Sequence, residues 1–124
     1  MEEMKKKFLY AKIHRATVRE ANLNYTGSIS IPYDLMQEVG ISEYELVQVV
    51  NINNGVRFET YVIKSEAGSK NICLNGAAAR LAMIDDRIII MAYCDLEPHE
   101  IAGHKPKIIV LDEENNIIEK RWEN

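Results

Sequence analysis

Eight polar residues of this 124-residue sequence stand in stretches that otherwise look like strands or turns, and their side chains could bind or react with a small molecule. They are Lys12, His14, Tyr25, Ser28, Arg57, Thr60, Tyr61 and Asn75. Arg57 offers a planar pair of donors for a carboxylate, and Lys12 could add a second positive charge. Ser28 follows Gly27, so this peptide bond is either a bend between two strands or a bond that the protein breaks.

The Gly27-Ser28 dipeptide alone does not decide between these interpretations, because Gly68-Ser69 repeats it among turn residues. Taken singly, each of the eight polar residues also has a structural explanation. The cations suit solvated strand positions, Thr60 favours strands, and Asn75 before a glycine favours a turn. Only their combination can indicate a function.

The motifs of several common enzyme classes are absent from the sequence. It contains no glycine-rich phosphate-binding loop, no GxSxG and no HExxH. His99 and His104 lie near acidic residues, but a spacing of five does not stack two ligands on one helix face. We therefore expect no metal site.

The composition is that of a soluble globular protein, with 47% hydrophobic and 27% charged residues. A net charge of -4 argues against a nucleic-acid partner, because phosphate binding needs clustered positive charge. No apolar run approaches the roughly 20 residues of a membrane span, and charged residues interrupt any signal-peptide core. We expect a cytoplasmic protein without a membrane partner, in which Cys73 and Cys94 are buried, reduced thiols.

The pattern of apolar residues predicts many short strands and two short helices. Strands are expected over residues 6–18, 28–31, 44–52, 56–64, 71–74, 86–94, 107–112 and 116–122. The helices are expected over residues 33–39, between Pro32 and Gly40, and over residues 75–83. Asn53-Asn54-Gly55 predicts a hairpin turn, and a second hairpin is expected around residues 113–116. Residues 86–94 suggest a strand buried on both faces, and residues 94–106 suggest a loop.

Many short strands in one small domain, residues 1–124, favour a closed β-barrel over an open sheet. Closure removes the strand edges that promote aggregation. The expected fold class is therefore mainly β, a small barrel with a few short helices.

Four motifs occur together and in order. They are Lys12-Ile13-His14-Arg15, Tyr25-Thr26-Gly27-Ser28-Ile29, Asn54-Gly55-Val56-Arg57-Phe58-Glu59-Thr60-Tyr61 and Asn75-Gly76-Ala77-Ala78-Ala79. From about residue 7 to residue 93 the chain resembles the bacterial, pyruvoyl-dependent L-aspartate α-decarboxylases, and the resemblance fades in the C-terminal tail. It implies a double-psi β-barrel and a homotetramer with active sites between subunits. The implied reaction converts L-aspartate to β-alanine and CO2, which feeds pantothenate biosynthesis.

Such a reaction needs an acceptor for the electrons that remain on the α-carbon when CO2 leaves. Pyridoxal phosphate is one acceptor, but the sequence offers no phosphate cradle for it. By resemblance, the chain is a proenzyme that cleaves itself into a β chain, residues 1–27, and an α chain, residues 28–124. Ser28 then becomes a pyruvoyl group that forms a Schiff base with aspartate. Glycine at position 27 leaves its carbonyl unshielded and tolerates strained dihedral angles.

The resemblance also implies roles for the other residues. Thr60 would stabilise the oxyanion of the cleavage step, and Tyr61 would protonate the product carbon. Substrate binding would involve Lys12, Arg57, Thr60, Asn75, Gly76, Ala77 and Ala78, while His14 and Tyr25 would support the cleavage site. Whether a maturation factor assists the cleavage stays open.

Two features depart from the family pattern. The stretch Ser28-Ile29-Ser30-Ile31-Pro32 lacks the acidic residue that usually follows the isoleucine, and Val50 stands where tryptophan is frequent. Two other interpretations remain. Residues 28–50 resemble AbrB-type DNA-binding β-domains, which would require a basic face. A decarboxylase-like barrel could also fold without cleaving and act as a scaffold.

Overall fold

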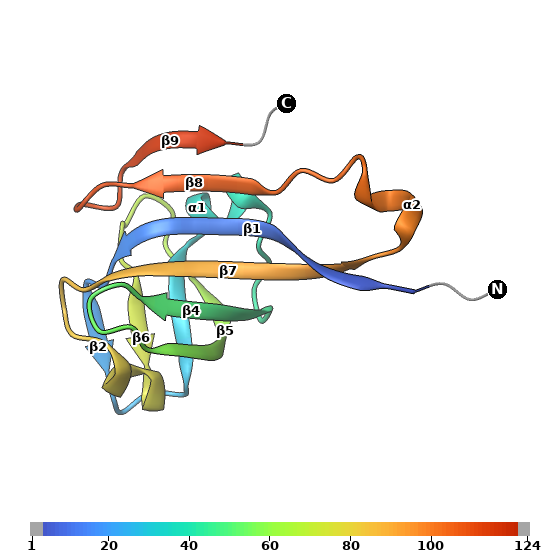
Figure 1. Cartoon of the computed structure of the whole chain (residues 1–124). Coiled ribbons are helices and arrows are strands. Elements are labelled where there is room, and N and C mark those ends of the chain that lie inside the picture. The colour runs from blue at the N-terminus through green and yellow to red at the C-terminus, as the bar shows by residue number, and fades with distance from the viewer. Residues whose placement is uncertain (1–3, 122–124) are drawn as a thin grey trace.

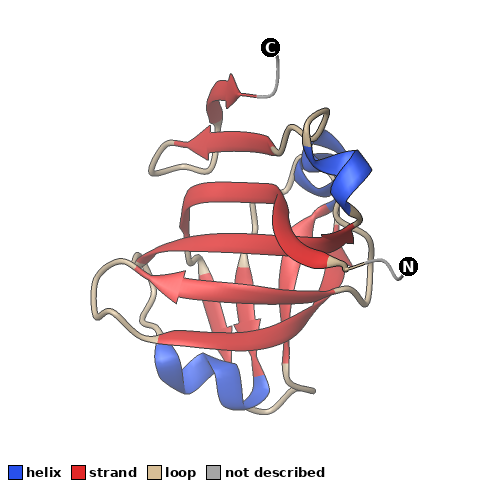
Figure 2. Ribbon diagram, turned by 45° about the vertical axis from the view of Figure 1, so that its right-hand side comes forward, coloured by secondary structure: helices blue, strands red, loops and turns tan. Residues whose placement is uncertain are grey.

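The computed structural model describes residues 4–121 and has the mainly β fold that the sequence predicts (Figure 2). The strands are β1 (Lys6–Thr17), β2 (Glu20–Asn22), β3 (Ser28–Pro32), β4 (Leu46–Asn51), β5 (Arg57–Ser65), β6 (Cys73–Asn75), β7 (Arg87–Leu96), β8 (Lys107–Leu111) and β9 (Ile117–Arg121). The helical segments are α1 (Tyr33–Val39), the 3-10 helix η1 (Gly76–Leu81) and α2 (Pro98–Ile101).

The strands follow one another in the order β2-β6-β3-β5-β4-β7-β1-β8-β9. β1 and β2 stand far apart in this order, yet only Val18 and Arg19 separate them in the chain. The sheet must therefore bend round on itself, and in Figure 1 β2 and β6 cross the direction of β4 and β7. The Arg19 N–H donates to the Ile72 carbonyl at 2.8 Å, which holds the bend beside β6. This curvature is consistent with a small barrel, whereas the double-psi connectivity stays a prediction.

The core lies inside this curved sheet and consists of aliphatic side chains from alternate strand positions. Fully buried examples are Ile13, Ile29, Val49, Ile88, Ile90 and Ile109. The prediction that residues 86–94 are buried on both faces is wrong, because Ile89 and Met91 are only half-buried. Their side of β7 is the outer face of the sheet, where side chains alternate with the core residues. Cys94 is likewise only partly buried, although both cysteines are free thiols as expected.

Local signals decide where the short elements begin and end. α1 has its predicted bounds, with Pro32 before its first turn and Gly40 at a φ of 88° after its last. The two predicted hairpins are confirmed, since β4 pairs with β5 and β8 with β9, both antiparallel. The expected loop over residues 94–106 instead contains the end of β7 and helix α2. A capping box between Glu97 and Glu100 and a proline at its start stabilise that helix.

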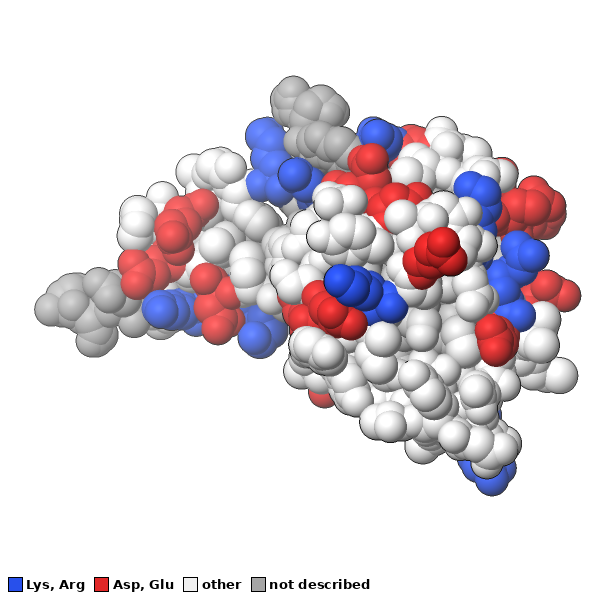
Figure 3. All heavy atoms as spheres, turned by 180° about the vertical axis from the view of Figure 1, so that it is seen from behind, with Lys and Arg blue, Asp and Glu red and all other residues white. Residues whose placement is uncertain are grey.

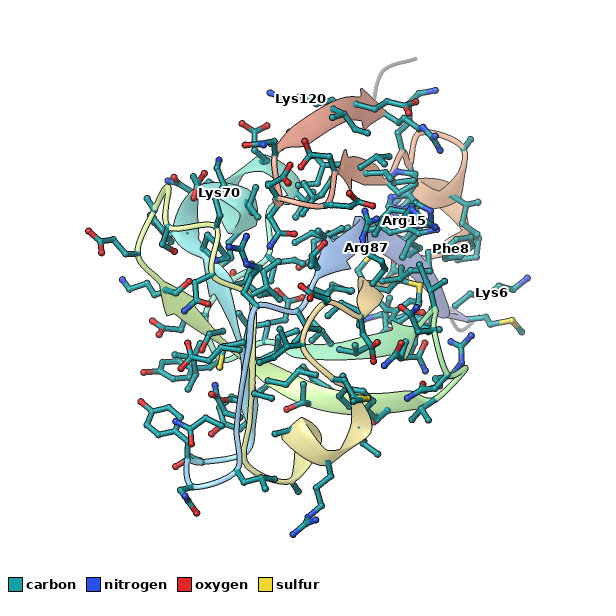
Figure 4. The ribbon with its side chains drawn as sticks, turned by 90° about the vertical axis from the view of Figure 1, so that its left-hand side faces the viewer. Lys6, Phe8, Arg15, Lys70, Arg87 and Lys120 are labelled. Carbon is teal, nitrogen blue, oxygen red and sulfur yellow. The ribbon has the colours of Figure 1, made fainter. Side chains whose placement is uncertain are left out.

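A β-bulge in β1 turns the chain toward β2. The register with β7 shifts between Ile13 and Ala16, and Arg15 between them has a φ of 66°. Arg87 donates to the Arg15 carbonyl from Nε at 3.1 Å and from Nη2 at 2.7 Å, and Figure 4 shows the two side by side. Nη2 also reaches the Leu111 carbonyl at 3.0 Å. These hydrogen bonds fix the bend between β1 and β2. β2 in turn pairs with β6.

Candidate active site

The Gly27-Ser28 bond lies at the boundary between an exposed turn and the buried sheet. Gly27 is exposed, whereas Ser28, the first residue of β3, has no exposed surface at all. The Ser28 hydroxyl donates to the Thr26 carbonyl at 3.0 Å. The residue two positions before Ser28 thus holds the serine side chain in place. Cleavage of the Gly27-Ser28 bond would put Thr26 and Ser28 on separate chains.

Asn75 is the second residue of this site. It ends β6 and lies opposite Ser28 in the antiparallel β3/β6 pair. Its Nδ2 donates to Ser28 Oγ at 3.0 Å and to Ser30 Oγ at 3.0 Å. Asn75 is 2% exposed, and its bond to Ser28 is buried, whereas the bond to Ser30 is partly buried. Two of the residues singled out from the sequence, Ser28 and Asn75, are therefore in direct contact.

Gly76 shows how closely the next segment approaches the cleavage site. Its φ is 65°, and a Cβ at this position would lie 2.6 Å from the Gly27 nitrogen and 2.7 Å from the Tyr25 carbonyl oxygen. Only glycine permits both the backbone angle and the contact. The start of η1 therefore packs directly on the backbone that precedes Ser28.

Gly27 itself differs from one sequence-based expectation. It is not among the glycines with positive φ, so its backbone shows no left-handed strain. A Cβ built at Gly27 would meet no atom within 4 Å. Gly27 is also exposed, so the residue that carries the scissile carbonyl lies at the surface.

β5 brings Thr60 and Tyr61 toward the same bond. β3 and β5 are parallel, and Ile29 pairs with Val62. Continued backward, this register aligns Ser28 with Tyr61 and Gly27 with Thr60. Alternation along β5 then puts Tyr61 on the face of the sheet that carries Ser28, and Thr60 on the opposite face. Both side chains are half-buried.

Lys12 and Arg57 share the outer face of the sheet but lie far from Ser28 within one chain. Arg57 Nη1 donates to Gln48 Oε1 at 2.9 Å, and Lys12 stands in the row Lys12-Met91-Gln48 across three paired strands. Lys12 is four strand steps from β3, about 19 Å along the sheet, and Arg57 is about 13 Å along β5 from Tyr61. Among the described residues, no hydrogen bond or ion pair joins either cation to Ser28, and Arg57 bonds to Gln48 instead.

The remaining predicted residues surround this arrangement. Tyr25, 56% exposed, lies in the turn before the bond, and Ala77 is exposed while Ala78 is buried. His14 is half-buried in β1, on the Lys12 face, and its Nδ1 has no hydrogen-bond partner. Burial lowers the pKa of His14, and the positive charges of Lys12 and Arg15 lower it further.

Three further residues of the site were missed from the sequence. Ser30 and Cys73 both contact Asn75, and Gln48 accepts from Tyr93 at 2.8 Å as well as from Arg57. Ser30 could have been inferred, because alternation places it on the face of Ser28. Cys73 and Gln48 could not, since their contacts depend on the register between strands.

Within residues 4–121, no three His, Cys, Asp or Glu side chains gather as a metal site would require. No helix in the same range combines the length and the apolar character that crossing a bilayer demands.

Comparison with known proteins agrees with the motifs. The family model described as aspartate decarboxylase matches residues 4–118. The chain belongs to the aspartate decarboxylase family. The match reaches well beyond residue 93, so the family pattern continues into the C-terminal tail, where the motifs alone had suggested that it fades. Membership in this family also argues against an AbrB-type DNA-binding domain.

Curated relatives from several bacteria cover most of the chain. An aspartate 1-decarboxylase of Caldicellulosiruptor bescii is 66% identical over 110 residues, which are 89% of this chain and 86% of the relative. The aspartate 1-decarboxylase of Clostridium acetobutylicum is 58% identical over 109 residues, 88% of this chain and 86% of the relative. That of Aliarcobacter butzleri is 54% identical over the same lengths. The family therefore encompasses the strands that carry Ser28, Arg57, Tyr61 and Asn75.

Proposed function

We propose that this protein is an aspartate 1-decarboxylase, which converts L-aspartate to β-alanine and CO2 and so supplies pantothenate biosynthesis. The observation that carries the proposal is the buried Ser28 hydroxyl, bonded to Asn75 directly after the exposed Gly27. It occurs in a chain of the aspartate decarboxylase family.

The first step is self-cleavage. Ser28 Oγ attacks the Gly27 carbonyl carbon, the Gly27–Ser28 C–N bond breaks, and an ester replaces the amide as the Ser28 nitrogen becomes a free amine. Removal of the Ser28 α-proton then forms a carbon–carbon double bond while the Cβ–Oγ bond breaks, which leaves Gly27 as a carboxylate. Hydrolysis of the resulting dehydroalanine releases ammonia and leaves a ketone at the new N-terminus. Thr60, aligned with Gly27, would stabilise the oxyanion of the attack.

The surroundings of Ser28 fit a pyruvoyl group. The site is buried, small residues flank Asn75 in η1, and Asn75 offers N–H donors where an oxygen would lie. A pyruvoyl group would supply a ketone that condenses with the substrate amine and accepts the electrons released as CO2 leaves. Asn75 and the backbone of Ala77 and Ala78 would orient it, and Gly76 allows η1 to lie this close.

The remaining residues would bind the substrate and move a proton. Arg57 and Lys12 would each bind one carboxylate of aspartate, a dianion at its two acid groups. Tyr61 would donate the proton to the α-carbon after CO2 leaves, because it shares the face of Ser28. His14 and Tyr25 would support the cleavage site without direct participation.

The active sites would form between subunits of a homotetramer. Arg57 and Lys12 stand several residues or strand steps along the sheet from Ser28, and in the proposed assembly the cations beside one serine would come from a neighbouring copy. Exposed apolar residues support such an assembly, among them Leu46 at 62%, Met83 at 74% and Ile84 at 58%. Figure 3 shows a broad area free of Lys, Arg, Asp and Glu on one face of the molecule.

Replacement of the serine tests this function. The Ser28→Ala variant should stay a single chain and release no CO2 from aspartate, because the hydroxyl that starts the cleavage is gone. Ser65→Ala, which removes a partly buried hydroxyl from the far end of β5, should behave as wild type. Decarboxylation by purified Ser28→Ala protein would contradict the proposal. If the wild-type chain were fully cleaved at Gly27-Ser28 but released no CO2 from aspartate, the self-cleavage would stand and the decarboxylase activity would be contradicted.

A further inference from the structure

The Asn75 side-chain amide makes three hydrogen bonds within the site, from both ends of the group. Both protons of Nδ2 are donated, one to Ser28 Oγ and one to Ser30 Oγ, each at 3.0 Å. Oδ1 lies 3.0 Å from Cys73 Sγ, close enough to accept the thiol proton. The register explains these contacts, since Cys73 lies opposite Ser30 and Asn75 opposite Ser28 on paired strands.

The thiol distinguishes the two possible orientations of the amide. With Oδ1 toward Cys73, the thiol donates and the amide accepts. With the amide turned over, Nδ2 would face the thiol and compete with it as a donor, and both serines would lose their N–H partner. Burial raises the pKa of Cys73 to about 11, so the thiol keeps its proton at neutral pH. The thiol also has the Leu74 carbonyl nearby, but at 3.8 Å that contact is the longer one.

We propose that Cys73 and Ser30 are positioning residues that hold the Asn75 amide with an N–H on Ser28 Oγ during self-cleavage. The inference rests on the proposed function and extends it to two residues that touch neither the scissile bond nor the substrate. Both residues act through Asn75. Cys73 donates its thiol proton to the amide oxygen, and Ser30 accepts the second N–H of the amide.

The held N–H matters most in the elimination step. When the Cβ–Oγ bond breaks, the bonding electrons move to Oγ, which becomes part of the Gly27 carboxylate. A donor already in place at Oγ stabilises that developing charge. The preceding attack on the carbonyl develops its charge on the Gly27 oxygen instead. Loss of the positioning residues should therefore slow elimination more than ester formation, and the ester should accumulate.

The test follows the ester in four variants of freshly purified protein. Cys73→Ala removes the thiol donor, whereas Cys73→Ser keeps a donor of similar size; Ser30→Ala removes the acceptor, whereas Ser30→Thr keeps it. Cys94→Ala and Ser65→Ala are matched controls outside the network. Intact mass spectrometry with and without hydroxylamine separates the species. Hydroxylamine cuts the ester and releases residues 28–124 with an N-terminal serine, whereas completed processing leaves a pyruvoyl end that is lighter by one ammonia.

We expect Cys73→Ala and Ser30→Ala to complete processing roughly tenfold or more slowly than wild type and to accumulate hydroxylamine-sensitive ester. Cys73→Ser and Ser30→Thr should restore most of the rate, and the controls should match wild type. Normal processing in both alanine variants would overturn the inference alone. The inference would also be overturned if the alanine variants were slow without accumulating ester and Cys73→Ser were slowed as much as Cys73→Ala. That result would indicate a packing role. A wild-type chain that never cleaves would instead overturn the proposed function.

Discussion

Ser28 combines two conditions that rarely meet at one serine. Its side chain is fully buried and bonded to Asn75, yet the residue before it is an exposed glycine. Burial fixes the nucleophile, while the scissile bond lies at the edge of the buried sheet. The residue types at these positions could be predicted from the sequence because four short motifs carry them. The contact of Cys73 with Asn75 could not, because it depends on the pairing of β3 with β6.

Tyr61 should act in decarboxylation but not in self-cleavage. Tyr61→Phe removes the phenolic proton and keeps the ring, so we expect normal conversion into two chains. Release of CO2 or of β-alanine should fall by about two orders of magnitude or more, as for the loss of a general acid. Tyr44→Phe, at a residue that is 71% exposed, is the matched control. A Tyr61→Phe enzyme with normal turnover would remove Tyr61 from the proton-donor role.

His14 should make stability depend on pH in a defined window. Burial, followed by the charges of Lys12 and Arg15, lowers its pKa in the folded state. Below the ordinary histidine value of about 6.5, the unfolded chain therefore binds a proton that the folded chain resists. The contribution to stability is present above that value and is lost as the pH falls through the folded pKa. NMR titration of the folded protein should give His14 a pKa below the ordinary histidine value of about 6.5. A His14 pKa at or above that value would contradict this account.

At the scale of elements, short-range signals were sufficient where a proline, a glycine or an Asn-Gly turn marked a boundary. α1 and the β4/β5 hairpin are examples. β2 was missed because three residues carry no periodicity, and its pairing with β6 joins segments that are about fifty residues apart in the chain. α2 was missed although its capping box and Pro98 were visible in the sequence. A segment of four helical residues is too short for an apolar period to develop.

The Asn115 side chain joins the turn between β8 and β9 to the end of β1 and to the segment before β6. In this turn Asn115 has a φ of 65° and is 1% exposed. Its side chain accepts from the Thr17 N–H at 2.7 Å and donates to the carbonyls of Thr17 and Lys70, each at 3.0 Å. Asn115→Ala leaves these buried backbone groups without partners, and we expect a loss of about 2–4 kcal/mol in the free energy of unfolding.

Urea unfolding followed by circular dichroism measures the effect of Asn115→Ala. The control is Asn116→Ala, an exposed neighbour in the same turn whose loss should matter much less. Equal midpoints for the two variants would show that the Asn115 contacts add little to stability.

At the scale of the whole molecule, the separation of the cations from Ser28 has a direct consequence for assembly. If each site takes its serine from one chain and its arginine from another, two inactive variants should rescue each other. Ser28→Ala supplies an intact Arg57, and Arg57→Ala supplies an intact Ser28. Random mixing by co-expression should regenerate roughly a quarter of the sites in a symmetric assembly.

Activity of the co-expressed pair is compared with that of each variant expressed alone. Recovered release of CO2 in the mixture supports sites between subunits. A mixture as inactive as its parents would assign the serine and the arginine of each site to one chain and would contradict the proposed assembly. Sites between subunits could be expected from the family resemblance, whereas the placement of Lys12, Arg57 and Ser28 along the sheet could not, because it depends on the order of the strands.

The central claim, that the Gly27-Ser28 bond is broken to make the catalytic group, is tested most directly by the intact mass of the purified wild-type protein. The account predicts two chains, residues 1–27 and residues 28–124, with the larger chain lighter by one ammonia than the same chain with an N-terminal serine. A single uncleaved chain that persists after prolonged warming, and that nonetheless releases CO2 from aspartate, would contradict it.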